Sequence, residues 1–367
     1  MEPALGDGGW FCFGFRLGDG VEGGPEPHPL SADGPGPVCR VRPSWSFAAV
    51  VAGPGAGPAR VRLQGAVRAA LPWDCLDALP SETHVLLLRE AALEAWPAAG
   101  PAALLEGQPA WRRALRPEEA AAAELPLVLG GYAAPRPPFF MPLPAALAAR
   151  KLALGLEHAL LLAAGGTLYS WGGGRHGQLG HGDLESRREP QAVEALQGLP
   201  VADAAAGGWH SAAVGEAGDL YLWGWNESGQ LGLPSKTAAG SRAAATEEEA
   251  GGTKLNVGPG DEPEGAEAAF ISMQALPALL DLPLEAEVRR ASCGSRHTAA
   301  VTRTGHLYTW GWGKYGQLGH QDLATSDQPR RVSYFVERNL SVQDVVCGPW
   351  TTYAQAVAAE SRPLQQP

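Results

Sequence analysis

The segment Leu307-Tyr-Thr-Trp310-Gly-Trp-Gly-Lys-Tyr-Gly316-Gln-Leu-Gly319 has two further copies in the chain, at 168–180 and 220–232. All three share a Trp-Gly pair and a closing Gly-Gln-Leu-Gly. In each copy, a histidine that opens a short apolar run lies 13 residues before the Trp. Because the same offset occurs three times, the segments are internal repeats. The three pairs are His158 and Trp171, His210 and Trp223, and His297 and Trp310.

Each repeat has the pattern of two short strands joined by a glycine turn. The apolar runs are too short for helices and are bounded by turn residues, which is typical of antiparallel hairpins. The Gly-rich stretch then supplies a loop with several positions where a positive φ is easily adopted. One such unit cannot bury both of its faces, whereas units stacked radially bury them all. The repeats therefore predict an all-β fold, a β-propeller.

Weaker copies extend the array toward both ends of the chain. His84 lies 12 residues before Trp96 but lacks the Gly-Gln-Leu-Gly part, and 46–50 matches the apolar strand alone. Residues 347–351 match the start of a repeat whose Trp strand is missing, and 10–14 (Trp-Phe-Cys-Phe-Gly) matches that strand. We therefore expect the N- and C-terminal strands to share one blade and close the ring, which removes free sheet edges.

The motifs L-Y-x-W-G-x-x-x-x-G-Q-L-G and C-G-x-x-H-T-A-A-V resemble the repeats of the regulator of chromosome condensation family. Strong matches cover 150–233 and 271–357, and the first 150 residues are divergent. The resemblance implies a propeller of seven blades. Six hairpin starts are countable, near residues 46, 84, 158, 210, 297 and 351, so one blade remains to be placed, within 97–150.

Two segments interrupt the array. The step from His210 to His297 is 87 residues, against 52 from His158 to His210, so 234–270 is an insertion. This insertion is rich in Glu, Asp and Gly, and we expect it to form an acidic disordered loop. Segment 97–150 is rich in Ala and Pro, and a short helix is expected from Pro117. The predicted organisation is divergent N-terminal blades at 1–96, a connecting segment or degenerate blade at 97–150, propeller repeats at 151–233, the insertion at 234–270, propeller repeats closing with the N-terminal strand at 271–357, and a tail at 358–367.

Composition limits the class of protein. A net charge of −11 disfavours nonspecific attraction to nucleic acid or anionic membranes, and 12 Trp in 367 residues argue against disorder. The five cysteines never fall in a C-x-x-C spacing, so neither a disulfide framework nor a Cys-rich zinc site is expected. The N-terminus has no secretory signal pattern and no apolar stretch is long enough for a membrane span. We therefore expect a reducing, intracellular compartment.

Sequence motifs of catalytic and cofactor sites are weak. Gly172-x-Gly174-x-x-Gly177 satisfies the dinucleotide fingerprint, but Gln-Leu-Gly-His follows where the fingerprint needs a helix, so we interpret these residues as turn glycines. The repeated histidines fall in different blades and are expected to be buried, with their nitrogens bonded to blade backbone groups. No nucleophile elbow, Walker loop or recognisable Cys–His signature occurs in the sequence. The sequence therefore predicts a protein that is not an enzyme and that uses no cofactor or metal.

The aromatic residues divide into two groups. Those at the fixed repeat position are expected to be buried between blades beside the repeated histidines; these structural anchors are His84, His158, His210, His297, Trp171, Trp223 and Trp310. Others occupy variable turns and strand ends, which a propeller gathers on its rims. They serve either to bind a partner or to cap the blade ends, since Trp, Tyr and Arg frequently anchor protein interfaces. The candidate partner-binding residues are Trp209, Trp225, Asn226, Arg296, Trp312, Lys314, Tyr315 and Trp350.

The family resemblance extends to function. The short acidic chain is similar to a small nuclear member of the family, which implies a JmjC-domain oxygenase (a histone demethylase or arginyl hydroxylase) as partner. It also implies a nuclear, chromosome-associated location, with the cytoplasm as a second one, and a role in chromatin regulation and chromosome segregation. We therefore interpret the protein as a scaffold that stabilises or targets the oxygenase, reaching histones indirectly and binding no nucleic acid or membrane directly.

Two other functional interpretations remain open at the level of sequence. The founding member of the family implies guanine-nucleotide exchange on a small GTPase, although no segment clearly matches its exchange wedge. Alternatively, arginines such as Arg136 or Arg150 are themselves substrates of the oxygenase.

Overall fold

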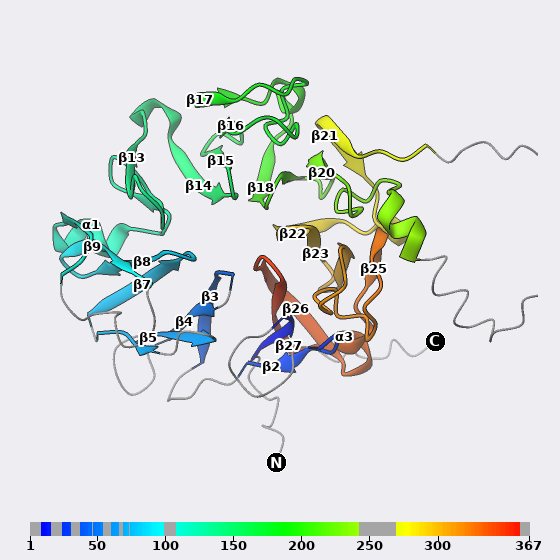
Figure 1. Ribbon diagram of the computed structural model, residues 1–367, viewed down its shortest axis with the longest axis horizontal. Helices are drawn as coiled ribbons and strands as arrows, with labels where there is room; N and C mark the ends of the chain where they lie inside the picture. Colours follow the sequence, from blue (N-terminus) through cyan, green and yellow to red (C-terminus); the bar gives the residue numbers. More distant parts are fainter. Residues whose placement is uncertain are drawn as a thin grey trace, which may run out of the picture.

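The computed structural model describes residues 9–15, 24–30, 37–45, 47–53, 60–65, 69–72, 74–98, 108–241 and 269–359. Their strands form seven sheets that stand around a central axis (Figure 1). The fold is therefore an all-β propeller with seven blades, as the sequence predicts. We number the blades in the order in which their innermost strands follow along the chain.

Six blades have four antiparallel strands and one has three. Blade 1 consists of β3 (Val38–Pro43), β4 (Phe47–Ala52), β5 (Arg60–Gly65) and β6 (Ala69–Ala70); blade 2 of β7 (Cys75–Pro80), β8 (His84–Arg89), β9 (Ala92–Pro97) and β10 (Trp111–Ala114). Blade 4 consists of β14 (Ala149–Leu154), β15 (His158–Ala163), β16 (Leu168–Gly172) and β17 (Arg187–Ala192); blade 5 of β18 (Val201–Ala206), β19 (His210–Gly215), β20 (Leu220–Trp225) and β21 (Met273–Leu280). Blade 6 consists of β22 (Val288–Cys293), β23 (His297–Thr302), β24 (Leu307–Gly311) and β25 (Ser326–Arg331).

Blade 7 closes the ring with strands from both ends of the chain. Its order is β26 (Leu340–Cys347), β27 (Thr351–Ala358), β1 (Gly9–Gly14) and β2 (His28–Pro29). Strand β1 pairs with β27 in antiparallel register, with Phe11 opposite Ala354. Because the first strand of the chain lies between two others, the sheet has no free edge at the closure. The predicted closure by the terminal strands is confirmed.

The seventh blade lies within 97–150, where it is expected, although no repeat marks it. It is blade 3, a three-stranded sheet of β11 (Leu127–Val128), β12 (Gly131–Ala133) and β13 (Phe140–Pro142). These strands are only two or three residues long and carry neither the histidine nor the Trp-Gly pair, so no repeat signal marks them. The expected short helix is present just before them as α1 (Pro117–Ala122).

The remaining regular elements are short connections. They include α3 (Ser333–Glu337) and three single turns of 3₁₀-helix, η1 (Ala145–Leu147), η2 (Glu194–Leu196) and η3 (Pro283–Glu285). Of the predicted acidic insertion at 234–270, residues 236–241 are helical rather than disordered, while 242–268 lie outside the described residues, as does most of the tail at 358–367. No helix of the described residues is long and apolar enough to cross a membrane.

The repeated residues join blades 4, 5, 6 and 7 to one another through the same hydrogen-bond network. At the junction of blades 5 and 6, His210 Nε2 lies 2.9 Å from Thr298 Oγ1, and this hydroxyl donates to the Gln230 carbonyl at 2.6 Å. The Trp310 indole N–H donates to the same carbonyl at 3.0 Å. Three conserved positions of the repeat, His, Trp and the Gln of Gly-Gln-Leu-Gly, therefore meet across a blade boundary.

The same network recurs at the neighbouring junctions. His158 Nε2 meets Ser211 Oγ at 2.8 Å, and Ser211 and Trp223 both donate to the Gln178 carbonyl. At the junction of blades 6 and 7, His297 pairs with Thr352 at 3.0 Å, and Thr352 donates to the carbonyl of the next Gly-Gln-Leu-Gly loop. The expectation that the imidazoles bond to backbone groups is therefore wrong for these three histidines, because each bonds to a hydroxyl of the next blade.

The hydroxyl fixes the tautomer of each imidazole. Because the Thr298 hydroxyl donates its hydrogen bond to a carbonyl, it accepts a hydrogen bond from Nε2–H of His210, which leaves Nδ1 of His210 unprotonated. Burial lowers the pKa of His210 to about 3, with smaller contributions from His297 and His158, and burial lowers the pKa of His297 to about 3 and of His158 to about 4. All three side chains are therefore neutral at pH 7.

A glycine three residues before each histidine makes room for the imidazole. A Cβ on Gly294 would lie 2.2 Å from His297 Cε1, and one on Gly155 would lie 2.5 Å from His158 Cε1. These distances are far below van der Waals contact, so only glycine fits. The spacing Gly-x-x-His in the repeats follows from this packing.

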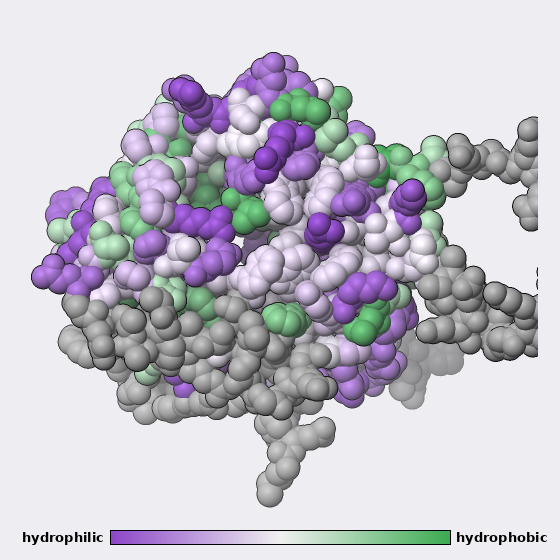
Figure 2. Space-filling model, viewed as in Figure 1, coloured by the Kyte–Doolittle hydropathy of each residue, from purple (hydrophilic) through white to green (hydrophobic). Residues whose placement is uncertain are grey.

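The first strand of each four-stranded blade lines a central channel. These inner strands are β3, β7, β14, β18, β22 and β26, and the channel has a volume of about 1070 Å³. Viewed down the axis, the molecule is hollowed near its centre (Figure 2). A strand of six residues spans about 20 Å. We call the end of the propeller where inner strands turn into second strands the turn face, carried by 155–157, 207–209, 294–296 and 348–350, and the other end the opposite face.

Candidate functional site

Aromatic side chains gather on the turn face because two variable positions of the repeat point there. One position immediately precedes the second strand of a blade. The other immediately follows the Gly of the Trp-Gly pair in its third strand, for which blade 7 has Phe13-Gly14. In three consecutive blades these positions carry large side chains, namely Trp209, Arg296 and Trp350 at the first position and Trp225, Trp312 and Phe15 at the second.

The first cluster lies over the junction of blades 4 and 5. The rings of Trp209 and Trp225 meet edge to face with centroids 5.3 Å apart, and His176 contacts both at 5.9 and 5.7 Å. The Arg296 guanidinium stacks over Trp225 at 4.6 Å, and Arg296 also lies 3.9 Å from Glu227. Burial, with Arg175 nearby, lowers the pKa of His176, so its ring is neutral at pH 7 and acts as another aromatic surface.

The second cluster lies over blades 6, 7 and 1. Trp312 meets Tyr315 at 4.7 Å and Trp350 at 4.8 Å, both close to edge to face. Phe15 contacts Tyr315 at 5.0 Å, and Trp45 contacts Trp350 at 5.2 Å. Such pairs contribute about 0.5–1.5 kcal/mol beyond the area they bury.

Together the two clusters form one surface, which we call the aromatic arc. Its backbone link is Arg296, whose carbonyl accepts from Trp312 N at 2.9 Å. The members are Phe15, Trp45, His176, Trp209, Trp225, Arg296, Trp312, Tyr315 and Trp350. Trp45 is 48% exposed and Tyr315 is 42% exposed, while the other four Trp are half-buried. The arc therefore presents ring surface to solvent from side chains that already pack on one another.

The loops that carry the arc are braced from within. Gln178 Oε1 accepts from the His176 backbone N–H at 2.8 Å, and Gln317 Oε1 accepts from the Tyr315 backbone N–H at 3.0 Å. Both glutamines are fully buried. A surface held in this way loses little conformational freedom on binding, which favours affinity.

The sequence placed most of these residues on the rim, with one error. Trp209, Trp225, Arg296, Trp312, Tyr315 and Trp350 lie together in the arc, and Lys314 is exposed beside it. Asn226 does not reach the surface: it is fully buried, and its amide donates to the carbonyls of Leu233 and Ile271. Asn226 therefore holds its own loop together instead of facing a partner.

Three members of the arc were missed by sequence reasoning. Phe15 was overlooked because its strand is displaced to the other end of the chain, and Trp45 because blade 1 matches the repeat poorly. His176 lies in the loop before Gly-Gln-Leu-Gly, two residues before Gln178, where Tyr315 lies before Gln317. Aligning the repeats by this position would have predicted His176.

The structural anchors occupy the blade interiors, except for one. Trp223 and Trp310 are fully buried, and Trp171 donates to the Tyr132 hydroxyl of blade 3 at 3.3 Å. His84 differs from the other histidines: it is only partly buried, its Nδ1 lies 3.0 Å from Thr83 Oγ1, and its ring packs on Phe139 at 4.9 Å. It therefore makes no contact with a neighbouring hydroxyl of the type found at the other junctions.

The glycines of the dinucleotide-like motif shape a turn. Gly172 has φ +108° and Gly177 has φ +71°, and a Cβ on Gly174 would lie 1.9 Å from the Glu185 carbonyl oxygen. Each is required by the local backbone, and a loop rather than a helix follows. The motif lacks the helix N-terminus that holds a pyrophosphate in dinucleotide sites.

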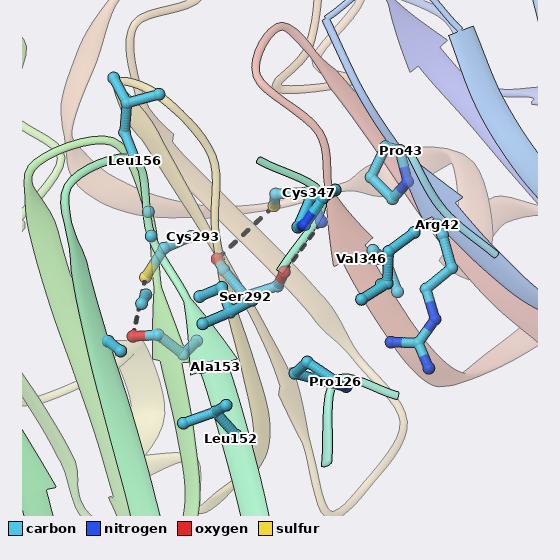
Figure 3. Close-up of a pocket in the computed structure, with 18 of the residues that line it drawn as sticks. Arg42, Pro43, Pro126, Leu152, Ala153, Leu156, Ser292, Cys293, Val346 and Cys347 are labelled. Carbon is cyan, nitrogen blue, oxygen red and sulfur yellow. Dashed lines mark hydrogen bonds between the residues drawn. The ribbon is translucent and has the colours of Figure 1, made fainter. Parts of the chain in front are cut away.

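The thiols in the channel wall are poor nucleophiles. Cys347 Sγ donates to the Ser292 carbonyl at 3.5 Å, and Cys293 Sγ donates to the Ala205 carbonyl at 3.8 Å (Figure 3). Burial raises the pKa of Cys347 to about 12 and raises the pKa of Cys293 well above its usual value. Both thiols stay protonated at neutral pH. Within the described residues, no group of three or more His, Cys, Asp or Glu is arranged to hold a metal ion.

Comparison with known proteins gives concordant matches. The profile described as Regulator of chromosome condensation (RCC1) repeat matches residues 165–214, 217–245 and 304–355, and a second profile of the same description matches 149–178, 201–230 and 288–317. A human protein named RCC1 domain-containing protein 1 is 50% identical over 377 residues, which cover 95% of this chain and 97% of that protein. The mouse protein of the same name is 47% identical over 380 residues, with the same coverage.

A solved structure agrees with the fold. The crystal structure of Prp20p from Saccharomyces cerevisiae, described with its binding properties to Gsp1p and histones, matches with a TM-score of 0.67 at 15% identity. The match covers 98% of this chain and 93% of that chain.

Proposed function

Because the chain belongs to the regulator of chromosome condensation (RCC1) repeat family, we propose that it is a non-enzymatic propeller scaffold that binds a protein partner through the aromatic arc. The observation that carries this proposal is the arc itself. Its rings are partly exposed, they lie on one face, and their loops are braced by buried glutamines. Interfaces concentrate their binding energy in such Trp, Tyr and Arg side chains.

The simpler explanation for these aromatic residues is that they cap the ends of the blades. Capping accounts for rings that are fully covered, but it does not account for the exposed faces of Trp45 and Tyr315. It also does not account for the distribution, because blade 4 has Glu157 and Gly173 at the two rim positions that carry large side chains in blades 5, 6 and 7. An uneven distribution around a regular ring favours recognition.

The partner that we propose is a JmjC-domain oxygenase that acts on histones or arginyl substrates, bound at the chromosome in the nucleus. This choice is supported by the resemblance of the repeat segments to a nuclear member of the family. In this proposal the propeller supplies no chemistry and stabilises or targets the oxygenase by binding its folded state.

The test compares binding by two variants of the purified full chain. The arc variant is Trp45→Ala with Tyr315→Ala, chosen because these exposed rings contribute least to the fold. The control is Leu129→Ala with Leu284→Ala, which removes two exposed apolar side chains (58% and 89%) outside the arc. We expect the arc variant to retain its melting temperature and to bind the oxygenase at least about tenfold more weakly, as loss of about 1.4 kcal/mol implies. Unchanged binding by the arc variant would refute the assignment of the arc.

Guanine-nucleotide exchange is the second candidate. It is favoured by the family and by the likeness of the fold to Prp20p, which is described as binding Gsp1p. Affinity purification of the tagged chain from nuclear extract separates the candidates. A stoichiometric oxygenase supports the scaffold, whereas a GTPase that is lost on adding excess nucleotide supports exchange. Faster release of labelled nucleotide from that GTPase at catalytic amounts of this chain would then establish it.

A further inference from the structure

The inner strands carry charges that alternate around the channel at the opposite face. Each of these strands has an irregularity in its pairing, after the first residue in five strands and after Val342 in β26, and the residue that follows the irregularity is charged in all six four-stranded blades. Blades 1, 4 and 6 carry a cation there, and blades 2, 5 and 7 carry a carboxylate. In blade order these residues are Arg40, Asp77, Lys151, Asp203, Arg290 and Asp344.

Two of the three carboxylates, Asp77 and Asp203, lie beneath the cations, whereas Asp344 is half-buried. Asp77 and Asp203 are both 2% exposed, whereas the side chains of Arg40, Lys151 and Arg290 are 42%, 38% and 49% exposed. Asp203 is shared between Lys151 of blade 4 and Arg290 of blade 6, the latter at 3.6 Å. The positive ends of these pairs therefore face solvent while the negative ends are buried.

Asp77 likewise pairs with two cations, both of them in β3 of the neighbouring blade 1. Asp77 accepts from Arg40 at 2.7 Å and from Arg42 at 3.0 Å. This single carboxylate pairs with two guanidinium groups, so it neutralises only part of their positive charge. The exposed donors of Arg40 remain available to an anion outside.

Two further arginines add charge that no carboxylate offsets. Arg150 and Arg289 are exposed, and they donate to the backbone carbonyls of Ala202 and Gln343 in the next blade. Neither has a carboxylate within ion-pair distance among the described residues. Five cations line the channel at this mouth, against three carboxylates, and Arg289 and Asp77 adjoin them through their contacts with Gln343 and Arg40. The lining cations are Arg40, Arg42, Arg150, Lys151 and Arg290, and the lining carboxylates are Asp203, Asp344 and Glu124.

We infer that this mouth binds an extended acidic peptide of a partner protein, whose carboxylates pair with Arg150, Arg289 and Arg290 while its chain enters the channel. A positive mouth in a protein of net charge −11 selects anions locally. Guanidinium groups also bind carboxylates with two parallel hydrogen bonds. The channel continues to the turn face, and an extended chain of about six residues spans an inner strand.

Nucleic acid fits this mouth less well than a peptide. Single-stranded binding sites combine cations with exposed aromatic rings on which bases stack. Of the aromatic residues that line the channel, Tyr132 and Trp171 are both buried, at 6% and 7% exposure. The wall above the mouth instead carries small and apolar side chains such as Ala153, Leu154 and Val346. These suit the apolar residues of a peptide.

The experiment measures the anisotropy of fluorescein-labelled hexaglutamate on addition of the full chain at low salt. The test variant is Arg150→Glu with Arg289→Glu, because neither arginine has a buried carboxylate that its loss would leave unpaired. The matched control is Arg188→Glu with Arg331→Glu, the same change of charge at exposed positions on the outer strands β17 and β25. We expect the test variant to bind at least about tenfold more weakly and the control to stay within about twofold, with affinity falling as salt is added.

Several outcomes would overturn the inference. These are a lack of saturable binding by the unaltered chain, equal weakening in the two variants, or tighter binding of a single-stranded DNA hexamer that competes with the peptide. If the test variant melts at a lower temperature, Arg289→Ala alone is compared with Arg331→Ala. The mouth lies at the other end of the channel from the aromatic arc, so Trp45→Ala with Tyr315→Ala should leave hexaglutamate binding unchanged. The two proposals therefore fail independently.

Discussion

Replacement of Thr298 by valine tests the hydrogen-bond network that joins the blades. The Thr298 hydroxyl is fully buried, accepts from His210 Nε2–H and donates to the Gln230 carbonyl. Valine keeps the shape but leaves the His210 N–H without an acceptor, and an unsatisfied buried donor costs about 1–3 kcal/mol. The Gln230 carbonyl keeps the Trp310 indole as a donor. We therefore expect Thr298→Val to lower the free energy of unfolding by about 2 kcal/mol.

A double-mutant cycle with Trp310→Phe isolates the shared carbonyl. Each single variant leaves Gln230 O with one donor, whereas the double variant leaves it with none. The double variant should therefore lose about 1 kcal/mol more than the sum of the single losses. Urea unfolding followed by far-UV circular dichroism provides the free energies, with comparison restricted to variants of equal m-value. Thr167→Val, at an exposed turn, is the control and should change stability by less than about 0.5 kcal/mol. Additivity of the two losses within about 0.3 kcal/mol would contradict a network that meets at this carbonyl.

Three further predictions follow from the buried groups. The pKa values of His158, His210 and His297 fall from 6.5 to about 4, 3 and 3 on folding, so between pH 6.5 and 4 the unfolded chain binds three protons that the folded chain does not bind. The free energy of unfolding should therefore fall with decreasing pH, by up to about 4 kcal/mol per pH unit near pH 5. Thermal melts that show no loss of stability between pH 7 and 5 would exclude this. Gly294→Ala should lower the free energy of unfolding by at least about 3 kcal/mol or prevent folding, because its Cβ would overlap His297. In the same melts Gly165→Ala, whose Cβ would meet nothing within 4 Å, should leave stability nearly unchanged. At pH 8 a thiol reagent should label Cys39 in the folded protein but not Cys75 and Cys347, because burial raises the pKa of both thiols to about 12. Fast labelling of all five thiols before unfolding would contradict the burial of Cys75 and Cys347.

The sequence predicted the repeats well because their residues form contacts between blades that recur at each junction. His, Trp-Gly and Gly-Gln-Leu-Gly must keep a fixed spacing to meet across a boundary, as His210, Trp310 and Gln230 do. Blade 3 escaped this reasoning because its strands are too short to carry the motif and its packing rests on irregular contacts, such as Phe139 against Trp111 at 5.9 Å. Such contacts follow no period and cannot be read from spacing.

The identity of the histidine partner could have been found in the sequence. Ser211 and Thr298 each directly follow a repeated histidine, and Thr352 occupies the same register in blade 7. A single repeat taken alone indicates no hydroxyl partner for its histidine, which is why backbone partners are expected from one repeat. The hydroxyl of one repeat serves the histidine of the preceding repeat, so the pairing appears only when consecutive repeats are considered together.

Blade 4 shows that these positions respond to their neighbours. The residue after His158 is Ala159 rather than Ser or Thr, and the preceding blade 3 has no repeated histidine that would need a hydroxyl. In the same way, Trp171 donates to the Tyr132 hydroxyl because blade 3 offers no Gly-Gln-Leu-Gly carbonyl. Blade 3 thus lacks the histidine and the Gly-Gln-Leu-Gly carbonyl of the network, and blade 4 correspondingly lacks the hydroxyl that would pair with them.

The same comparison between blades distinguishes positions that the fold requires from positions that can contact a partner. Positions that meet at the junctions keep their residue types in blades 5 and 6, because a change on one side leaves a buried polar group unsatisfied on the other. The rim positions are free of that constraint, yet they carry Trp209, Trp225 and Trp312 in neighbouring blades and Glu157 and Gly173 in blade 4. The opposite mouth shows a similar bias, with Lys151 and Arg290 partly exposed above the buried Asp203. Both patterns support the two proposals above, which place an apolar surface and a cationic one at the two ends of a single channel.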